Sequence, residues 1–301
     1  MSTPENGPDV IAGDKGKQKF RILIYTAFFP ALLTLMNGLC GLGCIHFATK
    51  HGLGARLDNV LCSSFWWASV LIFIAVACDM FDGRVARMTR NTSDFGAQLD
   101  SLCDAISFGV APAILILRVS VAAFRATDIA WFLPDITIER IFWCFSGIYV
   151  SCAVLRLARF NVESDEAEEC HVIFKGLPTP GAASSVTMVA LLYLNLSGET
   201  PNWLSPELLN AFAAILLPIL LLIAGLLMIS RVEYIHFANY YIKGNKPIGT
   251  LIKFVFILGL IILEPYVTLS VVTVVYLLSG PVVKVLSITT GRKVFNEYKQ
   301  Q

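Results

Sequence analysis

The stretch CDMFDGRVARMTRNTSDFGAQLDSLCDAISFG (Cys78–Gly109) places charged residues between two long apolar segments of the chain. It contains five aspartates and three arginines: Asp79, Asp82, Asp94, Asp100, Asp104, Arg84, Arg87 and Arg90. An ionised carboxylate at the centre of a membrane helix costs about 2.5–3.5 kcal/mol, so such residues are rare there and usually serve a function. The stretch therefore predicts two membrane helices that carry a functional site where they meet.

The composition of the whole chain is that of a membrane protein. Of the 301 residues, 56% are hydrophobic and only 15% are charged, whereas about a quarter are charged in typical soluble domains. The mean hydropathy is +0.68. A net charge of +1 without a long basic run argues against nucleic acid as a partner. We expect an all-α, polytopic integral membrane protein.

Apolar segments long enough to cross a bilayer, about 20 residues each, divide the chain. The sequence offers eight candidates: 30–49, 65–86, 97–117, 141–159, 181–197, 209–229, 249–263 and 266–286. Because the last two are short, it predicts six to eight spans. This organisation predicts four parts: a disordered N-terminal tail (1–14), an interfacial or juxtamembrane segment (15–29), a transmembrane catalytic domain (30–290) and a cytoplasmic C-terminal tail (291–301).

The positions of the basic residues predict how the protein is oriented. With the N-terminus inside, 18 of the 23 lysines and arginines fall in cytoplasmic segments. The five on the outer side are Lys50, Arg56, Arg118, Arg125 and Arg140. Because cytoplasmic segments carry an excess of Lys and Arg, both termini and the Asp-rich stretch are expected on the cytoplasmic side of the cell (inner) membrane. This arrangement requires an even number of spans.

The end of the second span places two carboxylates and two small residues on one face. At about 100° per residue, Asp82 lies about 60° from Asp79 around the helix axis. Gly83 and Ala86 lie within about 40° of Asp79. A helix neighbour would therefore meet acidic groups and open space on the same stripe.

The start of the third span repeats this pattern. Gly96, Asp100 and Asp104 follow one another at intervals of four residues and share a face. If the two spans are antiparallel neighbours, a rise of about 1.5 Å per residue sets Asp104 opposite Asp79. By the same rise, Asp100 lies opposite Asp82. The four carboxylates are thus expected to converge about 5–10 Å below the cytoplasmic membrane surface.

Four convergent carboxylates suit hard divalent cations. Oxygen ligands favour Mg²⁺ or Mn²⁺, and a pair of such ions commonly clamps a phosphoryl group during its displacement. Gly83, Ala86 and Gly96 would leave room for a nucleotide. Two other interpretations are a hairpin held by salt bridges to the nearby arginines and a cation transporter that uses the aspartates as its ion site. Transporters tend to show repeats and a site at the bilayer midplane, and the sequence shows neither.

The spacing of these residues resembles the signature of the CDP-alcohol phosphatidyltransferases: Asp79-x2-Asp82-Gly83-x2-Ala86-Arg87-x8-Gly96-x3-Asp100-x3-Asp104. The resemblance implies the fold of that family and a membrane enzyme that transfers a phosphatidyl group from CDP-diacylglycerol to an alcohol and releases CMP. It implies two divalent cations, Mg²⁺ or Mn²⁺, at Asp79, Asp82, Asp100 and Asp104. It also implies that Asp104 is the general base.

The resemblance further implies a pocket for the cytidine nucleotide beside the aspartates. We expect the nucleotide-binding residues to be Gly83, Ala86, Arg87, Gly96, Thr34 and Asn37. The last two belong to LTLMNGLCGL (33–42), near the cytoplasmic start of the first span.

This stretch and two others, VLRLARFN (154–161) and FKGLPTPGAA (174–183), resemble the branch of the family that uses L-serine as its acceptor. They supply Arg156, Arg159 and Lys175, which could bind the acceptor carboxylate or a lipid phosphate or only anchor the helices in the headgroups. The implied partners are CDP-diacylglycerol, L-serine and membrane lipids, and the implied assembly is a homodimer. Glycerol 3-phosphate, inositol phosphate and choline stay open as alternative acceptors.

Overall fold

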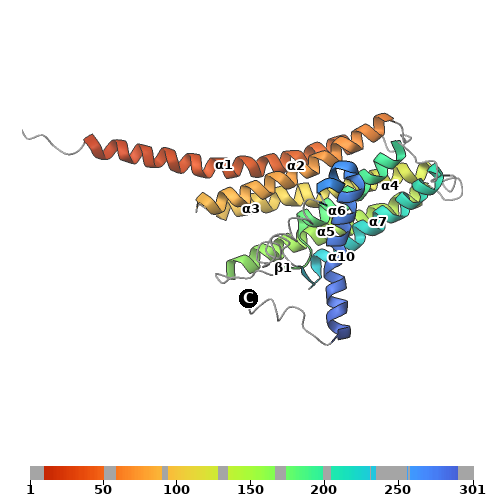
Figure 1. Cartoon of the computed structure of the whole chain (residues 1–301). Helices are drawn as coiled ribbons and strands as arrows, with labels where there is room; N and C mark the ends of the chain where they lie inside the picture. The colour runs from red at the N-terminus through yellow and green to blue at the C-terminus, as the bar shows by residue number, and fades with distance from the viewer. Residues whose placement is uncertain are drawn as a thin grey trace, which may run out of the picture.

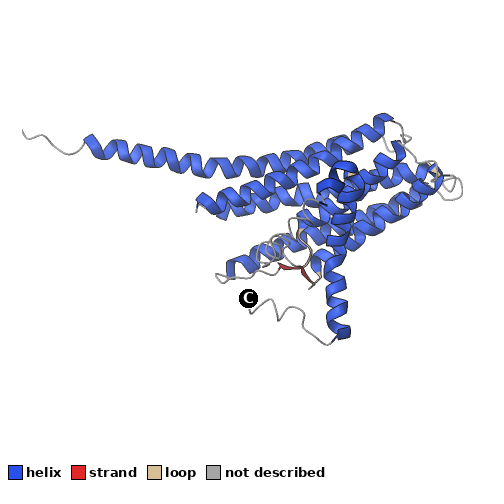
Figure 2. Ribbon diagram, in the orientation of Figure 1, coloured by secondary structure: helices blue, strands red, loops and turns tan. Residues whose placement is uncertain are grey.

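The computed structural model describes residues 10–50, 59–89, 94–127, 135–166, 174–198, 205–230, 232–234, 256 and 258–290. Nearly all of these residues are helical (Figure 2). The elements in chain order are α1 (Val10–Thr49), α2 (Asn59–Thr89), α3 (Asp94–Asp104), the π-helix η1 (Ala105–Val110), α4 (Ala111–Arg125), α5 (Asp135–Glu166), β1 (Phe174–Lys175), α6 (Thr179–Gly198), α7 (Pro206–Ile229), β2 (Glu233–Tyr234) and α10 (Pro265–Thr290). The predicted all-α class is confirmed, with a two-residue strand pair as its single addition in the described part of the chain.

Seven helical segments within the described residues are long and apolar enough to cross a membrane: Pro30–Thr49, Cys62–Arg84, Phe95–Arg125, Ile136–Val162, Thr179–Gly198, Pro206–Ile229 and Pro265–Val285. The third of them combines α3, η1 and α4. This confirms the predicted polytopic helical membrane protein. The predicted span 249–263 lies largely outside the described residues, of which 256 and 258–263 are helical.

The first helix begins earlier than the sequence suggested. α1 runs without a break from Val10 to Thr49, so the juxtamembrane segment 15–29 continues directly into the first span. Residues 10–14, expected in a disordered tail, form its first turn, and 1–9 lie outside the described residues. Once a span is helical, each added residue extends the helix without a new nucleation step, which explains the extension into a polar segment.

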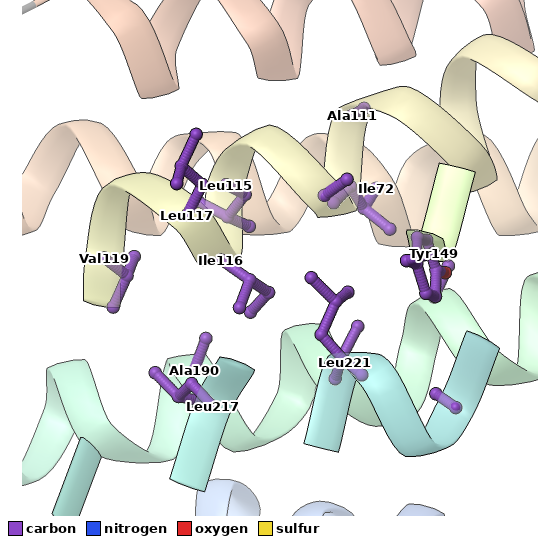
Figure 3. Packing of buried hydrophobic residues seen from close by; sticks show 14 of the residues in the cluster. Ile72, Ala111, Leu115, Ile116, Leu117, Val119, Tyr149, Ala190, Leu217 and Leu221 are labelled. Atoms are coloured by element: carbon purple, nitrogen blue, oxygen red, sulfur yellow. The ribbon is translucent and has the colours of Figure 1, made fainter. Parts of the chain in front are cut away.

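α4 lies at the centre of the bundle. It contacts α1, α2, α5, α6 and α7, and every residue from Ala111 to Phe124 except Ile114 is buried. A helix that is apolar on all sides is expected to be surrounded by other helices. Figure 3 shows Ile116 of α4 near Leu217 and Leu221 of α7 in this core.

The outer helices present apolar side chains to their surroundings. Only 17% of the Pro265–Val285 span is buried, against 78% of Phe95–Arg125. Large exposed apolar surfaces are typical of contact with lipid. In Figure 1, α1 and α2 lie side by side along most of their length, whereas α10 crosses the direction of the other helices.

A short strand pair fastens the loop before α6 to the end of α7. β1 and β2 pair antiparallel, and the pairing is extended by hydrogen bonds from Gly176 N to Val232 O (2.8 Å) and from Leu177 N to Leu227 O (3.1 Å). Gly176 has φ +91°, and a Cβ there would lie 2.5 Å from Met228 O. Only glycine fits this conformation without strain. The strand pair and the two hydrogen bonds beside it therefore fix where α6 begins.

Candidate active site

Three carboxylates meet between α2 and α3. The last turns of α2 carry Asp79 and Asp82, and α3 carries Asp100 and Asp104. One oxygen each from Asp79, Asp82 and Asp100 lie within 4.8 Å of one another. Asp82 and Asp104 are 5% and 8% exposed. Helical spacing therefore gathers ligand atoms from two helices close enough to share a cation.

Asp104 lies next to this group, at the level expected from antiparallel helices. It interacts electrostatically with Asp79 and, to a lesser extent, with Asp100 and Asp82, and Asp79 in turn interacts with Asp100 and Asp82. The carboxylates of the two helices thus face one another, as the helical spacing predicts. Asp104 differs from the other three in its surroundings, because it is not part of the group within 4.8 Å.

α1 supplies hydrogen bonds to two of the carboxylates. Thr34 Oγ1 lies 3.1 Å from Asp82 Oδ2 and 3.1 Å from Pro30 O, so its one proton serves one acceptor at a time. Asn37 Nδ2 donates to Asp104 Oδ1 over 2.8 Å. Thr34 and Asn37 are 6% and 0% exposed. Both were expected to contact the nucleotide, and the structure places both against the aspartates, where they orient the carboxylates.

A π-helical turn, η1, follows α3 directly. It is held from two sides: Ser107 Oγ donates to Asn37 O (2.8 Å), and Tyr149 OH donates to Phe108 O (2.9 Å). A Cβ added to Gly41 of α1 would lie 2.7 Å from Ser107 Oγ and 2.8 Å from Ser107 Cα. π-turns are rare and frequently lie at functional sites. Here the turn fixes α3, with its two aspartates, against α1.

The donor set fits a divalent cation. Carboxylate oxygens are the ligands that Mg²⁺ and Mn²⁺ prefer. Asp100 Oδ1 is buried and has no hydrogen-bond partner among the described residues, which is costly unless another group binds it. Of the nearby arginines, Arg84 is exposed, while the side chains of Arg87 and Arg90 lie outside the described residues. The aspartate cluster could therefore hold a metal ion.

The residues predicted to line the nucleotide pocket lie beside the cluster or on its helices. Gly83 is exposed, and a Cβ added there would meet no described atom within 4 Å. Open space thus borders the backbone next to Asp82. Gly96 is half-buried on α3. Ala86 and Arg87 lie on α2, but their side chains are outside the described residues.

One of the three predicted acceptor-binding cations interacts with a carboxylate of the site. Arg156 Nη1 donates to Thr179 Oγ1 (3.0 Å) at the start of α6, and the guanidinium interacts electrostatically with Tyr276 of α10 and, to a lesser extent, with Asp104. Arg156 Nε is buried without a hydrogen-bond partner in the described part of the chain. Arg159 is half-buried on the same helix. Lys175 is in β1, and its side chain lies outside the described residues.

Sequence reasoning missed three polar residues near the site. Thr179 orients Arg156, as described above. Ser101 Oγ lies 3.0 Å from Asn161 Oδ1 and links α3 to α5. No spacing pattern could identify these pairs, because each joins two helices. The one available signal was Thr179 itself, a polar residue at the entry to an apolar helix.

Comparison with known proteins covers the same region. A family model described as CDP-alcohol phosphatidyltransferase matches residues 27–224, which include all four aspartates and the contact between Arg156 and Thr179. The chain belongs to the CDP-alcohol phosphatidyltransferase family. The family resemblance of the sequence is thereby confirmed, and family membership favours a transferase over a cation transporter.

Several relatives in this family share one name. The chain is 31% identical over 255 residues to the CDP-diacylglycerol–serine O-phosphatidyltransferase of Helicobacter pylori, which covers 84% of this chain and 89% of that protein. A protein of the same name from Mycobacterium tuberculosis is 29% identical over 269 residues, which cover 88% of this chain and 81% of that protein. A third, from Methanocaldococcus jannaschii, is 34% identical over 193 residues, which cover 64% of this chain and 74% of that protein.

Proposed function

We propose that this protein transfers the phosphatidyl group of CDP-diacylglycerol to the hydroxyl of L-serine, giving phosphatidylserine and CMP. The observation that carries the proposal is the aspartate cluster, with its unpartnered Asp100 Oδ1, in a chain that aligns over most of its length with relatives named for this reaction.

The site residues divide into metal ligands and a base. Asp79, Asp82 and Asp100 would hold the divalent cations, with Asp104 at their edge. We propose two ions, Mg²⁺ or Mn²⁺. When bound, such ions neutralise the diphosphate and stabilise the charge on the leaving phosphate. Thr34 keeps Asp82 in place from α1.

The transfer itself needs one proton acceptor. The serine hydroxyl attacks the phosphorus that carries the diacylglycerol, forming a new oxygen–phosphorus bond. The bond between that phosphorus and the CMP oxygen breaks, and CMP leaves with the electron pair. The hydroxyl proton passes to Asp104, because an alcohol is a weak nucleophile without a base. Asn37 holds the Asp104 carboxylate through Oδ1, which leaves Oδ2 to take the proton.

The substrates reach the site from two phases. The apolar outer surface keeps the diacylglycerol in the bilayer, and the open backbone at Gly83 suits the cytidine nucleotide. We propose that this end of the bundle faces the cytoplasm, as the distribution of Lys and Arg favours, and that the protein sits in the cell (inner) membrane. By family resemblance we also propose a homodimer.

CMP release by the purified protein in detergent micelles tests the proposal. With CDP-diacylglycerol and Mg²⁺ or Mn²⁺, L-serine should give stoichiometric CMP and phosphatidylserine, identified by mass spectrometry. Glycerol 3-phosphate, inositol phosphate and choline serve as competing acceptors in parallel reactions. CMP release with one of these but not with serine would overturn the acceptor assignment and keep the reaction class. No CMP with any alcohol would overturn both.

A further inference from the structure

Two buried polar atoms of opposite kind, on side chains that interact with Asp104, have no hydrogen-bond partner among the described residues. Asn37 Oδ1, a hydrogen-bond acceptor, and Arg156 Nε, a donor, are both inaccessible and make no hydrogen bond with the described residues. Buried polar groups in native proteins are nearly always paired, and exceptions are frequent where a ligand binds. The two atoms cannot both be satisfied by one simple ion, because one accepts and the other donates.

The same carboxylate connects the two side chains. Asn37 Nδ2 donates to Asp104 Oδ1 (2.8 Å), so the unpartnered Oδ1 is the other end of an amide that is already fixed. Arg156 interacts electrostatically with Tyr276 of α10 and, to a lesser extent, with Asp104, and its Nη1 is fixed by Thr179 Oγ1 (3.0 Å). Asn37 is on α1, Arg156 on α5 and Thr179 on α6. Three helices thus hold one free acceptor and one free donor on side chains that interact with the proposed base.

We propose that Arg156 and Asn37 recognise the acceptor as a free α-amino acid. Arg156 Nε donates to the α-carboxylate, Asn37 Oδ1 accepts from the α-ammonium, and the side-chain hydroxyl is thereby directed toward Asp104. This inference rests on the proposed function and adds how serine is selected. A guanidinium is well suited to a carboxylate, and an amide oxygen can accept from an ammonium but not from an anion.

This arrangement predicts which alcohols are rejected. An acceptor without a carboxylate leaves Arg156 Nε unpaired, and one without an ammonium leaves Asn37 Oδ1 unpaired. A site that leaves its own buried polar groups unpaired discriminates strongly against such an analogue. Thr179 acts as a positioning residue, since it orients Arg156 and does not itself meet the acceptor.

Selectivity between matched acceptors tests the proposal. L-serine is compared with ethanolamine, which lacks the carboxylate, and with 3-hydroxypropionate, which lacks the ammonium. Each analogue is measured both as an acceptor in CMP release and as a competitor of serine. Arg156→Gln should lower kcat/KM for serine by about 10- to 100-fold, the effect of one lost hydrogen bond to a charged group. Any loss through the interaction with Asp104 falls equally on ethanolamine, so the measured quantity is the preference for serine over ethanolamine, which should fall by about tenfold or more.

Asn37 is tested through the other analogue. Asn37→Ala also removes the hydrogen bond to Asp104, so kcat should fall for every acceptor. If Asn37 reads the ammonium, the preference for serine over 3-hydroxypropionate should fall in addition by about tenfold or more. If that preference stays unchanged while kcat falls, Asn37 only positions Asp104 and the proposal is wrong for this residue.

Controls separate this inference from the proposed function. Arg140→Gln removes one exposed cation from the other end of α5 and should leave both preferences unchanged. Thr179→Val should reduce the serine-over-ethanolamine preference in the same sense as Arg156→Gln, and it replaces that variant if the latter does not fold. Equal losses for all acceptors in Arg156→Gln would mean that Arg156 acts only through Asp104 or on the donor diphosphate, and would overturn the inference. If the unaltered protein does not use serine at all, the proposed function fails first.

Discussion

At the scale of single residues, the proposed chemistry depends on carboxylates that are held together against their own repulsion. Oxygens of Asp79, Asp82 and Asp100 lie within 4.8 Å of one another. Two unit charges about 4 Å apart repel by about 4 kcal/mol at the effective dielectric of a protein surface. A bound cation removes this repulsion, so it should affect the stability of the protein as well as its activity.

Removing one of these ligands should therefore change two measurements. Asp79→Asn or Asp100→Asn should lower the rate of CMP release by at least about 100-fold, because several kcal/mol of transition-state stabilisation are lost. The rise in Tm that Mg²⁺ or Mn²⁺ causes in the unaltered protein should shrink in both variants. EDTA should abolish activity, and added cation should restore it.

Glu207→Gln is the matched control, because Glu207 is an exposed carboxylate at the start of α7, outside the cluster. It should retain both the activity and the cation-dependent Tm. Substantial CMP release in EDTA would contradict the metal assignment.

Asp104 should respond differently from the three clustered aspartates. Asp104→Asn keeps an oxygen that can accept from Asn37 Nδ2 but removes the proton acceptor. We expect kcat to fall by about 100- to 10,000-fold, the usual contribution of a general base. The affinity for Mn²⁺, measured by calorimetry, and the affinity for CDP-diacylglycerol should change little. A loss of Mn²⁺ affinity as large as in Asp79→Asn would make Asp104 chiefly a ligand.

Gly83 tests where the nucleotide lies. The space beside it is open, so Gly83→Leu should fold normally and fill the region next to Asp82 without altering a charge. CDP-diacylglycerol binding should weaken by about tenfold or more, as expected when a bulky group occupies a ligand site. Gly147→Leu is the control, since its surroundings on α5 are equally open. Native affinity in Gly83→Leu would move the pocket elsewhere.

At the scale of elements, apolar length located the helices and could not reveal how η1 is built. The predicted first span, 30–49, matches the structure, and most other spans differ by a few residues at each end, because hydropathy depends on local composition alone. The convergence of the aspartates followed from helical spacing in the same way. η1 depends on bonds from Ser107 to Asn37 and from Tyr149 to Phe108, which join distant parts of the chain. No local pattern encodes them.

The close contact between α1 and η1 should be intolerant of even one added methyl group. In Gly41→Ala the new Cβ would lie 2.8 Å from Ser107 Cα, so one of the two helices must shift. Overpacking of this kind costs about 1–3 kcal/mol, and Tm should fall. The shift should also disturb the pair of Asn37 and Asp104, so kcat should fall while the protein remains folded.

Gly147→Ala provides the comparison for this substitution. Gly147 is also within a helix but meets no described atom within 4 Å. Alanine should therefore raise stability, by up to about 1 kcal/mol, through its higher helix propensity. Equal Tm values for the two alanine variants would show that α1 and η1 are not tightly packed.

At the scale of the whole molecule, the strand pair constrains which loops share a side of the membrane. β1 precedes α6 and β2 follows α7, and the two strands pair. α6 and α7 must therefore cross outward and back. Arg156, near the end of α5, bonds to the start of α6 and interacts with Asp104, so this side is the side of the aspartates. We propose that this side faces the cytoplasm, as the Lys and Arg distribution favours.

The C-terminus depends on one further crossing. Seven spans are found in the described residues, and an odd total would place the two termini on opposite sides. The basic residues of the tail, including Arg292 and Lys293, favour the cytoplasm, and this requires an eighth span between β2 and α10, where the sequence predicts 249–263. Fusion of green fluorescent protein after Gln301 should therefore give fluorescence, and fusion of alkaline phosphatase there should give no activity. Alkaline phosphatase fused after Gly198, at the outer end of α6, is the positive control. Active phosphatase after Gln301 would mean that α10 does not end on the side of the aspartates, and it would contradict the antiparallel packing of α10 on α6.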